Sequence, residues 1–163
     1  MAEKNIRIFL RSERYEVEAS LFSSGDEEGD LLTKLMNLAE QGPEVFEIRS
    51  EGTLQQEDGR VAISYVETEA TGMEGSRTTV SFLSDNPLVV TMTREGGVST
   101  TLVFESGKRY RCVYQTPYMP FEICVRTLKV ENNLMGLGTL SLDYVIEIRG
   151  AKAERNKLFL QIL

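Results

Sequence analysis

The feature that most constrains the fold is an alternation of apolar and polar residues, with a period of two, that runs through most of the chain. Val61, Ile63 and Tyr65 show it, and the stretch from Leu140 to Ile148 repeats it. A period of two places successive side chains on opposite faces of a β-strand, whereas a helix needs a period near 3.6. We therefore expect mainly strands, each with one face buried and the other in water.

Short links carrying turn-forming residues, such as Asp58-Gly59 and Gly96-Gly97, separate these alternating runs. Such links permit antiparallel hairpins but not parallel crossovers. Ser12-Glu13-Arg14 is expected to join the first two strands as a hairpin. The expected strands are 5–11, 15–22, 43–55, 60–71, 76–84, 87–95, 97–105, 109–116, 119–130, 138–149 and 154–163.

Successive antiparallel strands with one apolar face each can bury that face by closing the sheet into a barrel. Closure also pairs the edge strands, so that no strand edge is exposed. We predict an all-β fold, a single antiparallel up-and-down barrel of about eight to ten strands. Nothing in the 163 residues looks like a linker, so we expect a single domain over residues 1–163.

The phase of each strand predicts which side chains point into the barrel. Those expected inside are Ile6, Ile8, Leu10, Val61, Ile63, Tyr65, Val80, Phe82, Leu88, Val90, Met92, Val98, Leu102, Phe104, Ile123, Val125, Leu140, Leu142, Tyr144, Ile146, Ile148, Leu158, Leu160 and Ile162. In the run 15–22, Tyr15 shares a face with Val17, Ala19 and Leu21. The opposite faces carry mostly Thr, Ser, Glu and Arg, which suits a solvated exterior.

One short helix is expected at residues 30–41. Asp30 can cap its start, apolar residues from Leu31 to Ala39 recur at helical spacing, and Gly42-Pro43 ends it. The acidic stretch 26–30 lacks the ligand spacing of a calcium loop, so we read it as favouring the positive end of the helix dipole. We expect the helix to plug or flank the barrel.

Composition excludes several function classes. The formal net charge is −7 and Lys and Arg are scattered singly, so neither nucleic acid nor an anionic membrane is an expected partner. The chain contains no histidine, which removes Ser-His-Asp and Cys-His catalysis and most zinc sites. No apolar stretch resembles a signal peptide or a membrane span. We expect a soluble cytoplasmic protein with no metal and no cofactor.

The two cysteines, Cys112 and Cys124, would lie directly opposite each other on one face if the 109–130 hairpin turned around Tyr118. A slip of one residue would forbid a disulfide between them. Because cytoplasmic thiols are kept reduced, we expect two free cysteines.

From residue 48 onward the chain resembles a known family. The segments that carry the resemblance are Ile63-Ser64-Tyr65-Val66-Glu67, Arg94-Glu95-Gly96, Phe104-Glu105-Ser106-Gly107, Tyr114-Gln115-Thr116-Pro117-Tyr118, Val125-Arg126-Thr127 and Leu142-Asp143-Tyr144. Their order and spacing are similar to those of the YwiB-like proteins, an uncharacterised bacterial family. The resemblance implies a lipocalin-like, or calycin, β-barrel. It implies no activity, although barrels of this type commonly enclose small apolar ligands.

Two residues stand out as candidates for chemistry, because Glu67 and Arg94 are each in phase with an inward-facing run and end their strands. Three readings stay open: both emerge into solvent at the rim, they pair structurally, or they bind an anionic head group. If they are inside, they should pair, since a buried unpaired charge is costly. The candidate ligand-binding residues of the interior or rim are Tyr65, Glu67, Arg94, Tyr114, Tyr118, Arg126 and Tyr144.

Two functional hypotheses follow. The first is a non-catalytic barrel that binds a small, largely apolar or amphipathic ligand. The second is a protein-interaction or regulatory module with a filled barrel, which could be a homodimer; the apolar loop residues Leu134 and Met135 motivate it. An enzyme is the least expected reading, because no motif marks a catalytic pair.

Overall fold

The computed structural model describes residues 2–17, 44–68, 74–97, 99–115, 119–148 and 153–163. This part of the chain contains ten strands and no helix. The predicted helix at 30–41 lies outside the described residues, as do Val98 and Tyr118. The strands are β1 (Ala2–Val17), β2 (Glu44–Glu57), β3 (Arg60–Val66), β4 (Arg77–Leu83), β5 (Asn86–Glu95), β6 (Thr100–Glu105), β7 (Arg109–Gln115), β8 (Pro120–Asn133), β9 (Thr139–Ile148) and β10 (Ala153–Ile162).

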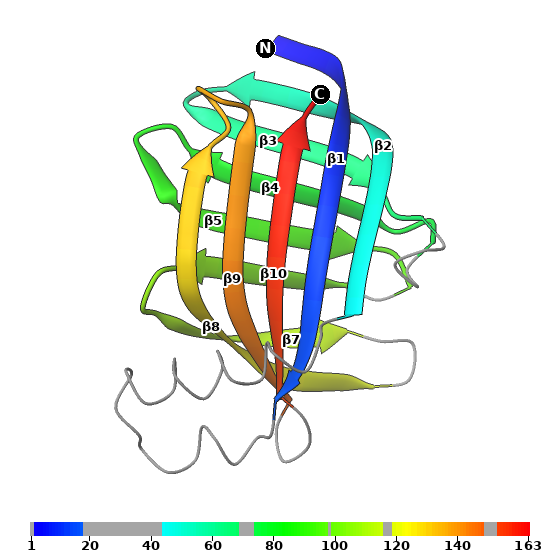
Figure 1. Ribbon diagram of the computed structural model, residues 1–163, viewed down its shortest axis with the longest axis vertical. Helices are drawn as coiled ribbons and strands as arrows, with labels where there is room; N and C mark the ends of the chain where they lie inside the picture. Colours follow the sequence, from blue (N-terminus) through cyan, green and yellow to red (C-terminus); the bar gives the residue numbers. More distant parts are fainter. Residues whose placement is uncertain (1, 18–43, 69–73, 98, 116–118, 149–152) are drawn as a thin grey trace.

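All ten strands form one antiparallel sheet in the order β6-β5-β4-β3-β2-β1-β10-β9-β8-β7. Consecutive strands are neighbours, except that β6 and β7 are the two edges of the sheet, and the first and last strands pair along most of their length. The sheet folds over into two layers whose strands cross steeply, with β8, β9, β10 and β1 in front and β3 to β6 behind (Figure 1). Such crossed layers bury the inner faces of both against each other.

The two edges of the sheet, β6 and β7, meet at one bridge. Ser99 and Gln115 exchange two backbone hydrogen bonds, of 2.9 and 2.8 Å. The barrel is therefore nearly closed at this point, and the prediction of an antiparallel up-and-down barrel is confirmed at the level of an all-β barrel.

Local sequence explains the turns and bends. Asp58 and Gly59 both have positive φ, 52° and 77°, which is the backbone of a two-residue hairpin between β2 and β3. Gly52 lies where the β2–β3 ladder begins while β2 is still paired with β1, opposite Ile6 on one side and Tyr65 on the other. In Figure 1, β2 bends over from the front layer to the back.

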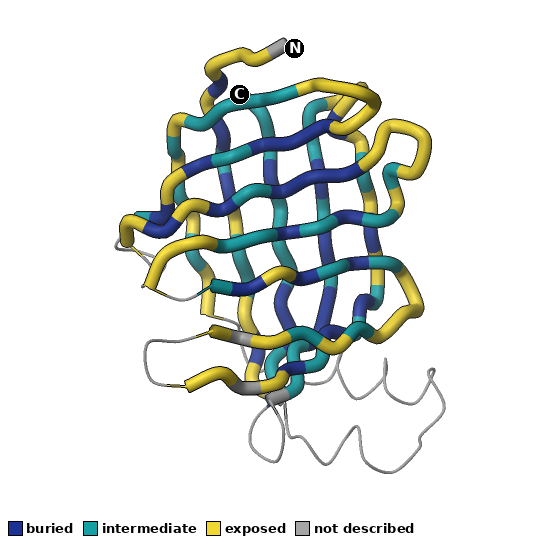
Figure 2. The backbone as a smooth tube through the Cα atoms, turned by 180° about the vertical axis from the view of Figure 1, so that it is seen from behind, coloured by how far each residue is buried: buried dark blue, intermediate teal, exposed yellow. Residues whose placement is uncertain are grey.

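The interior is built as the alternation predicts. Most of the side chains expected inside are buried, including Ile8, Ile63, Phe104 and Leu160, which are fully enclosed. In Figure 2 the buried positions alternate along the strands of the near layer with half-buried or exposed ones. Leu88 is an exception at 58 % exposure. It lies where the β4–β5 ladder is irregular, beyond the regular part of the sheet.

The expected hairpin at Ser12-Glu13-Arg14 is wrong, because β1 continues through these residues. Its ladders to β2 and β10 run without a bulge, so Ser12 and Arg14 share the inner face with Leu10. Tyr15 therefore lies on the outer face, and yet it is only 8 % exposed. The apolar pattern changes phase here because the outer face is also buried at Tyr15. In the sequence alone, this change of phase resembles the start of a second strand.

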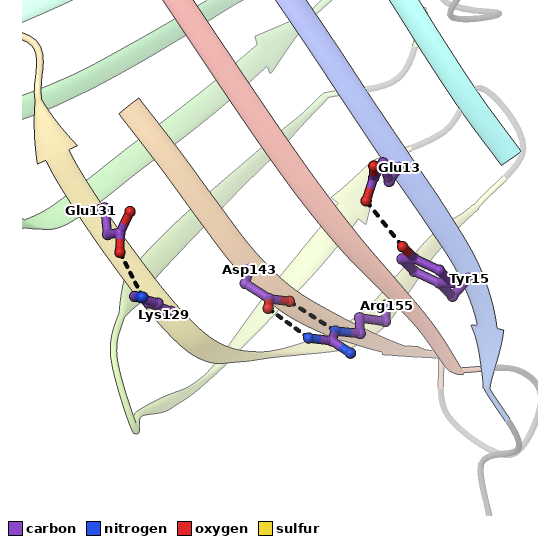
Figure 3. A network of polar contacts seen from close by, with 6 residues as sticks. All are labelled: Glu13, Tyr15, Lys129, Glu131, Asp143 and Arg155. Atoms are coloured by element: carbon purple, nitrogen blue, oxygen red, sulfur yellow. Dashed lines mark hydrogen bonds and ion pairs between the residues drawn. The ribbon is translucent and has the colours of Figure 1, made fainter. Parts of the chain in front are cut away.

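A polar network lies on this outer face, across β1, β9 and β10 (Figure 3). Arg155 is buried and donates two hydrogen bonds to Asp143, of 2.9 and 2.7 Å. Its guanidinium also lies 6.0 Å from the centre of the Tyr15 ring, while the Tyr15 hydroxyl donates to Glu13. A bidentate pair of this kind helps to fix the β9–β10 register.

Candidate functional site

A cavity of about 300 Å³ opens between the two layers, toward the end of the barrel where β1 and β9 finish and β10 begins. Its apolar wall comes from seven side chains on both layers, namely Leu10, Phe46, Ile48, Met92, Leu102, Ile146 and Leu158. This volume is at the lower end of the range for sites that bind small molecules.

One side of the cavity is a buried polar cluster formed by β3, β4 and β5. The Glu67 side chain is only 2 % exposed, and its Oε1 lies 3.8 Å from Nε of Arg94. Thr78 donates a hydrogen bond of 2.7 Å to the same oxygen. Glu67 and Arg94 therefore form a buried ion pair, and the reading in which both emerge into solvent is wrong.

Tyr65 completes this cluster. Burial raises the pKa of its phenol, and the charge of Glu67 and a hydrogen bond to Glu67 raise the pKa further. The phenol therefore stays protonated at neutral pH and donates a hydrogen bond to the Glu67 carboxylate. Tyr144, which packs its ring against Phe104 at 4.5 Å between centroids, also lines the cavity.

A second pair of charges lies across the cavity. Arg14 on β1 and Glu154 on β10 form a salt bridge between Nε and Oε1, and both side chains are partly exposed. The side chains of Ser12 and Asn156 lie beside this pair on the same inner faces. Among the described residues, the charged side chains that line the cavity are therefore two arginines and two glutamates.

Four of the seven candidate residues come together here: Tyr65, Glu67, Arg94 and Tyr144. Arg126 does not, because it lies on the strand face opposite the buried Val125 and Thr127. Tyr114 has only its backbone described, and Tyr118 lies outside the described residues.

The prediction missed Arg14, Glu154 and Asn156. Extending the phase of Ile6, Ile8 and Leu10 by two further steps reaches Ser12 and Arg14. Extending the phase of Leu158, Leu160 and Ile162 backwards reaches Asn156 and Glu154. The signal was present in the alternation, but polar residues on an inner face look like a turn when the strand is read alone.

The cysteines are free, as expected, and the register explains why. Cys112 pairs with Ile123, while Cys124 pairs with Arg111. This is the one-residue slip that forbids a disulfide: Cys112 packs against the core and Cys124 lies on the opposite face. Burial, and then the nearby Cys124, raise the pKa of the Cys112 thiol to about 11.

This environment predicts slow modification of Cys112. In a Cys124→Ser variant, iodoacetamide at pH 8 should label folded Cys112 at least about 10-fold more slowly than the urea-unfolded chain, because burial keeps the thiol protonated and the thiolate is the reactive form. Mass spectrometry of timed samples measures both rates. Equal rates, or a disulfide in the wild type on non-reducing electrophoresis, would contradict the assigned register.

Comparison with known proteins bears on the family. Residues 32–160 match the model of a family described as a domain of unknown function, DUF1934. The chain belongs to the DUF1934 family. A crystal structure of the YwiB protein from Bacillus subtilis is similar over 99 % of this chain and 96 % of that one, with a TM-score of 0.63 and 16 % identity. No curated protein matches significantly.

These matches confirm the YwiB-like resemblance inferred from the sequence. At 16 % identity, the structural match supports the fold of this DUF1934 chain and no activity. Within the described residues, no helix is long and apolar enough to cross a membrane, and no group of three or more Cys, Asp or Glu could hold a metal ion.

Proposed function

We propose that this DUF1934 barrel is a non-catalytic binding protein for a small, largely apolar ligand held between its two layers. The observation that supports the proposal most directly is the cavity of about 300 Å³, with apolar walls and a few convergent polar groups. That combination is typical of small-molecule sites. A lipocalin-like, or calycin, relationship would suit the same function.

The Glu67–Arg94 pair favours a binding role over a purely structural one. Replacing a buried ion pair by apolar residues of similar volume is often neutral or stabilising, so the pair contributes little net stability. Here it borders a cavity instead of a packed core. Charged groups beside an otherwise apolar cavity are well placed to orient a polar group of a ligand.

Filling the cavity should weaken the binding of a small apolar ligand. N-phenyl-1-naphthylamine is a neutral apolar fluorophore, and we expect its emission to rise when it binds the wild type. The Leu158→Trp variant should weaken this binding at least tenfold, because the larger side chain occupies the cavity. Leu88→Trp is the matched control, since Leu88 is 58 % exposed and away from the cavity. Circular dichroism checks that both variants fold.

Equal binding by wild type and Leu158→Trp would count against the cavity as the site. Absence of binding to the folded wild type, with this dye and with a panel of short-chain alcohols and acids, would count against the proposed function.

A protein-interaction module is the second candidate. Exposed apolar side chains gather on neighbouring turns at one end of the barrel: Leu83, Leu88, Met135 and Leu137. Contacts from Gln56 to Met135 and from Asn132 to Pro87 join these turns. Leu134 does not contribute, because it is buried in the core. A homodimer by light scattering that dissociates in Leu137→Glu would favour this candidate.

A further inference from the structure

The charges that line the cavity are balanced and already paired. Arg94 lies beside Glu67 and Arg14 beside Glu154, so the described lining carries no net formal charge. Each arginine therefore faces the cavity with a carboxylate close to it. A ligand entering this space meets guanidinium donors and carboxylate acceptors, but no excess of either charge.

Of the two ion pairs, Glu67–Arg94 lies deeper and restricts the charge of a ligand head group more strongly. The Glu67 side chain is 2 % exposed and that of Arg94 18 %, whereas those of Arg14 and Glu154 are 43 % and 31 % exposed. Water screens the outer pair but reaches the inner pair poorly. A charged head group beside Glu67 and Arg94 would be attracted by one and repelled by the other, and it would lose its hydration.

A neutral polar head group avoids this cost. An amide or a hydroxyl can accept a hydrogen bond from a guanidinium and donate one to a carboxylate, and it is far less costly to dehydrate than an ion. Tyr65, Ser12 and Asn156 add neutral hydrogen-bonding groups around the same space. The polar part of the lining therefore matches a head group that both donates and accepts.

We propose that the barrel selects neutral amphipathic ligands, with an apolar chain or ring and an uncharged amide or hydroxyl head group, over the corresponding carboxylates and amines. This inference rests on the proposed binding function and specifies its ligand class. The apolar part lies against side chains such as Met92, Leu102 and Leu158, and the head group lies between the two ion pairs.

The test uses four ligands that differ only in the head group: nonanamide, 1-nonanol, nonanoate and nonylamine. At pH 7 the acid is ionised and the amine protonated. Displacement of N-phenyl-1-naphthylamine from the wild type should give dissociation constants at least tenfold lower for the amide and the alcohol than for either ion.

Two substitutions should then change the order of affinities, one in favour of the carboxylate and the other in favour of the amine. Glu67→Gln gives the lining a net positive charge and should strengthen the binding of nonanoate at least tenfold relative to that of nonanamide. Arg94→Gln gives a net negative charge and should do the same for nonylamine. Glu131→Gln and Arg111→Gln make the same changes at exposed positions and should leave the order unchanged. If Glu67→Gln does not fold, Glu154→Gln makes the same charge change at the outer pair.

The outcomes separate this inference from the function on which it rests. Nonanoate or nonylamine as the tightest wild-type ligand would overturn the preference for neutral head groups while leaving a binding barrel. An order of affinities unchanged in folded Glu67→Gln and Arg94→Gln would also overturn it. No displacement by any of the four ligands, together with no dye binding, would instead reject the binding function itself.

Discussion

Replacing Arg94 by methionine is expected to lower the free energy of unfolding by about 3 to 5 kcal/mol, because it removes the positive charge that lies 3.8 Å from a buried carboxylate. Thr78 and Tyr65 still donate hydrogen bonds to Glu67, but neutral hydrogen bonds replace little of that stabilisation. Urea denaturation followed by circular dichroism measures the change.

Two further variants identify the cause. Glu67→Gln combined with Arg94→Met removes both charges and should recover most of the loss, since the cost arises from the isolated carboxylate. Arg111→Met breaks an exposed pair with Glu122 and should cost less than about 1 kcal/mol. A loss below about 1 kcal/mol in Arg94→Met, or no recovery in the double variant, would show that the pair is not buried as described.

Gly52→Val should strongly destabilise the barrel. A Cβ at position 52 would lie 2.6 Å from the backbone oxygen of Ser64, and a backbone atom in a paired strand has little freedom to move away. We expect a loss of at least about 3 kcal/mol, at or beyond the upper end of the usual range for overpacking. Gly52→Ala should already cause most of it.

Gly136→Ala is the matched control, because a Cβ there meets nothing within 4 Å. It should change the free energy of unfolding by less than about 1 kcal/mol. Equal stability of Gly52→Ala and Gly136→Ala in urea would mean that the backbones of β2 and β3 do not approach each other closely at Gly52.

The alternation in the sequence predicts the strands well wherever one face is buried and the other is in water. Leu140, Leu142 and Tyr144 on β9 illustrate this, since all three are buried as expected. The prediction fails where both faces are buried or where an inner face is polar. Tyr15 and Arg14 illustrate these two cases, and together they made one long strand resemble a hairpin.

The candidate site was predictable in part for the same reason. Glu67 and Arg94 continue apolar inward-facing runs, so phase made them candidates for the interior but left a position at the solvent-exposed rim open. Their pairing required the register of β3, β4 and β5, which long-range strand contacts determine and a local pattern does not contain. Cys112 and Cys124 show the same limit. The register differs by one residue from a hairpin that turns around Tyr118, so the two cysteines lie on opposite faces instead of on one face.

A high-resolution crystal structure of the protein saturated with nonanamide would test most directly whether the space between the layers holds a ligand. We predict continuous non-protein density in the cavity, with its polar end near Glu67 and Arg94 and its chain against Met92 and Leu158. A cavity closed by protein side chains, or occupied by ordered water alone at saturating ligand, would contradict the proposed binding function.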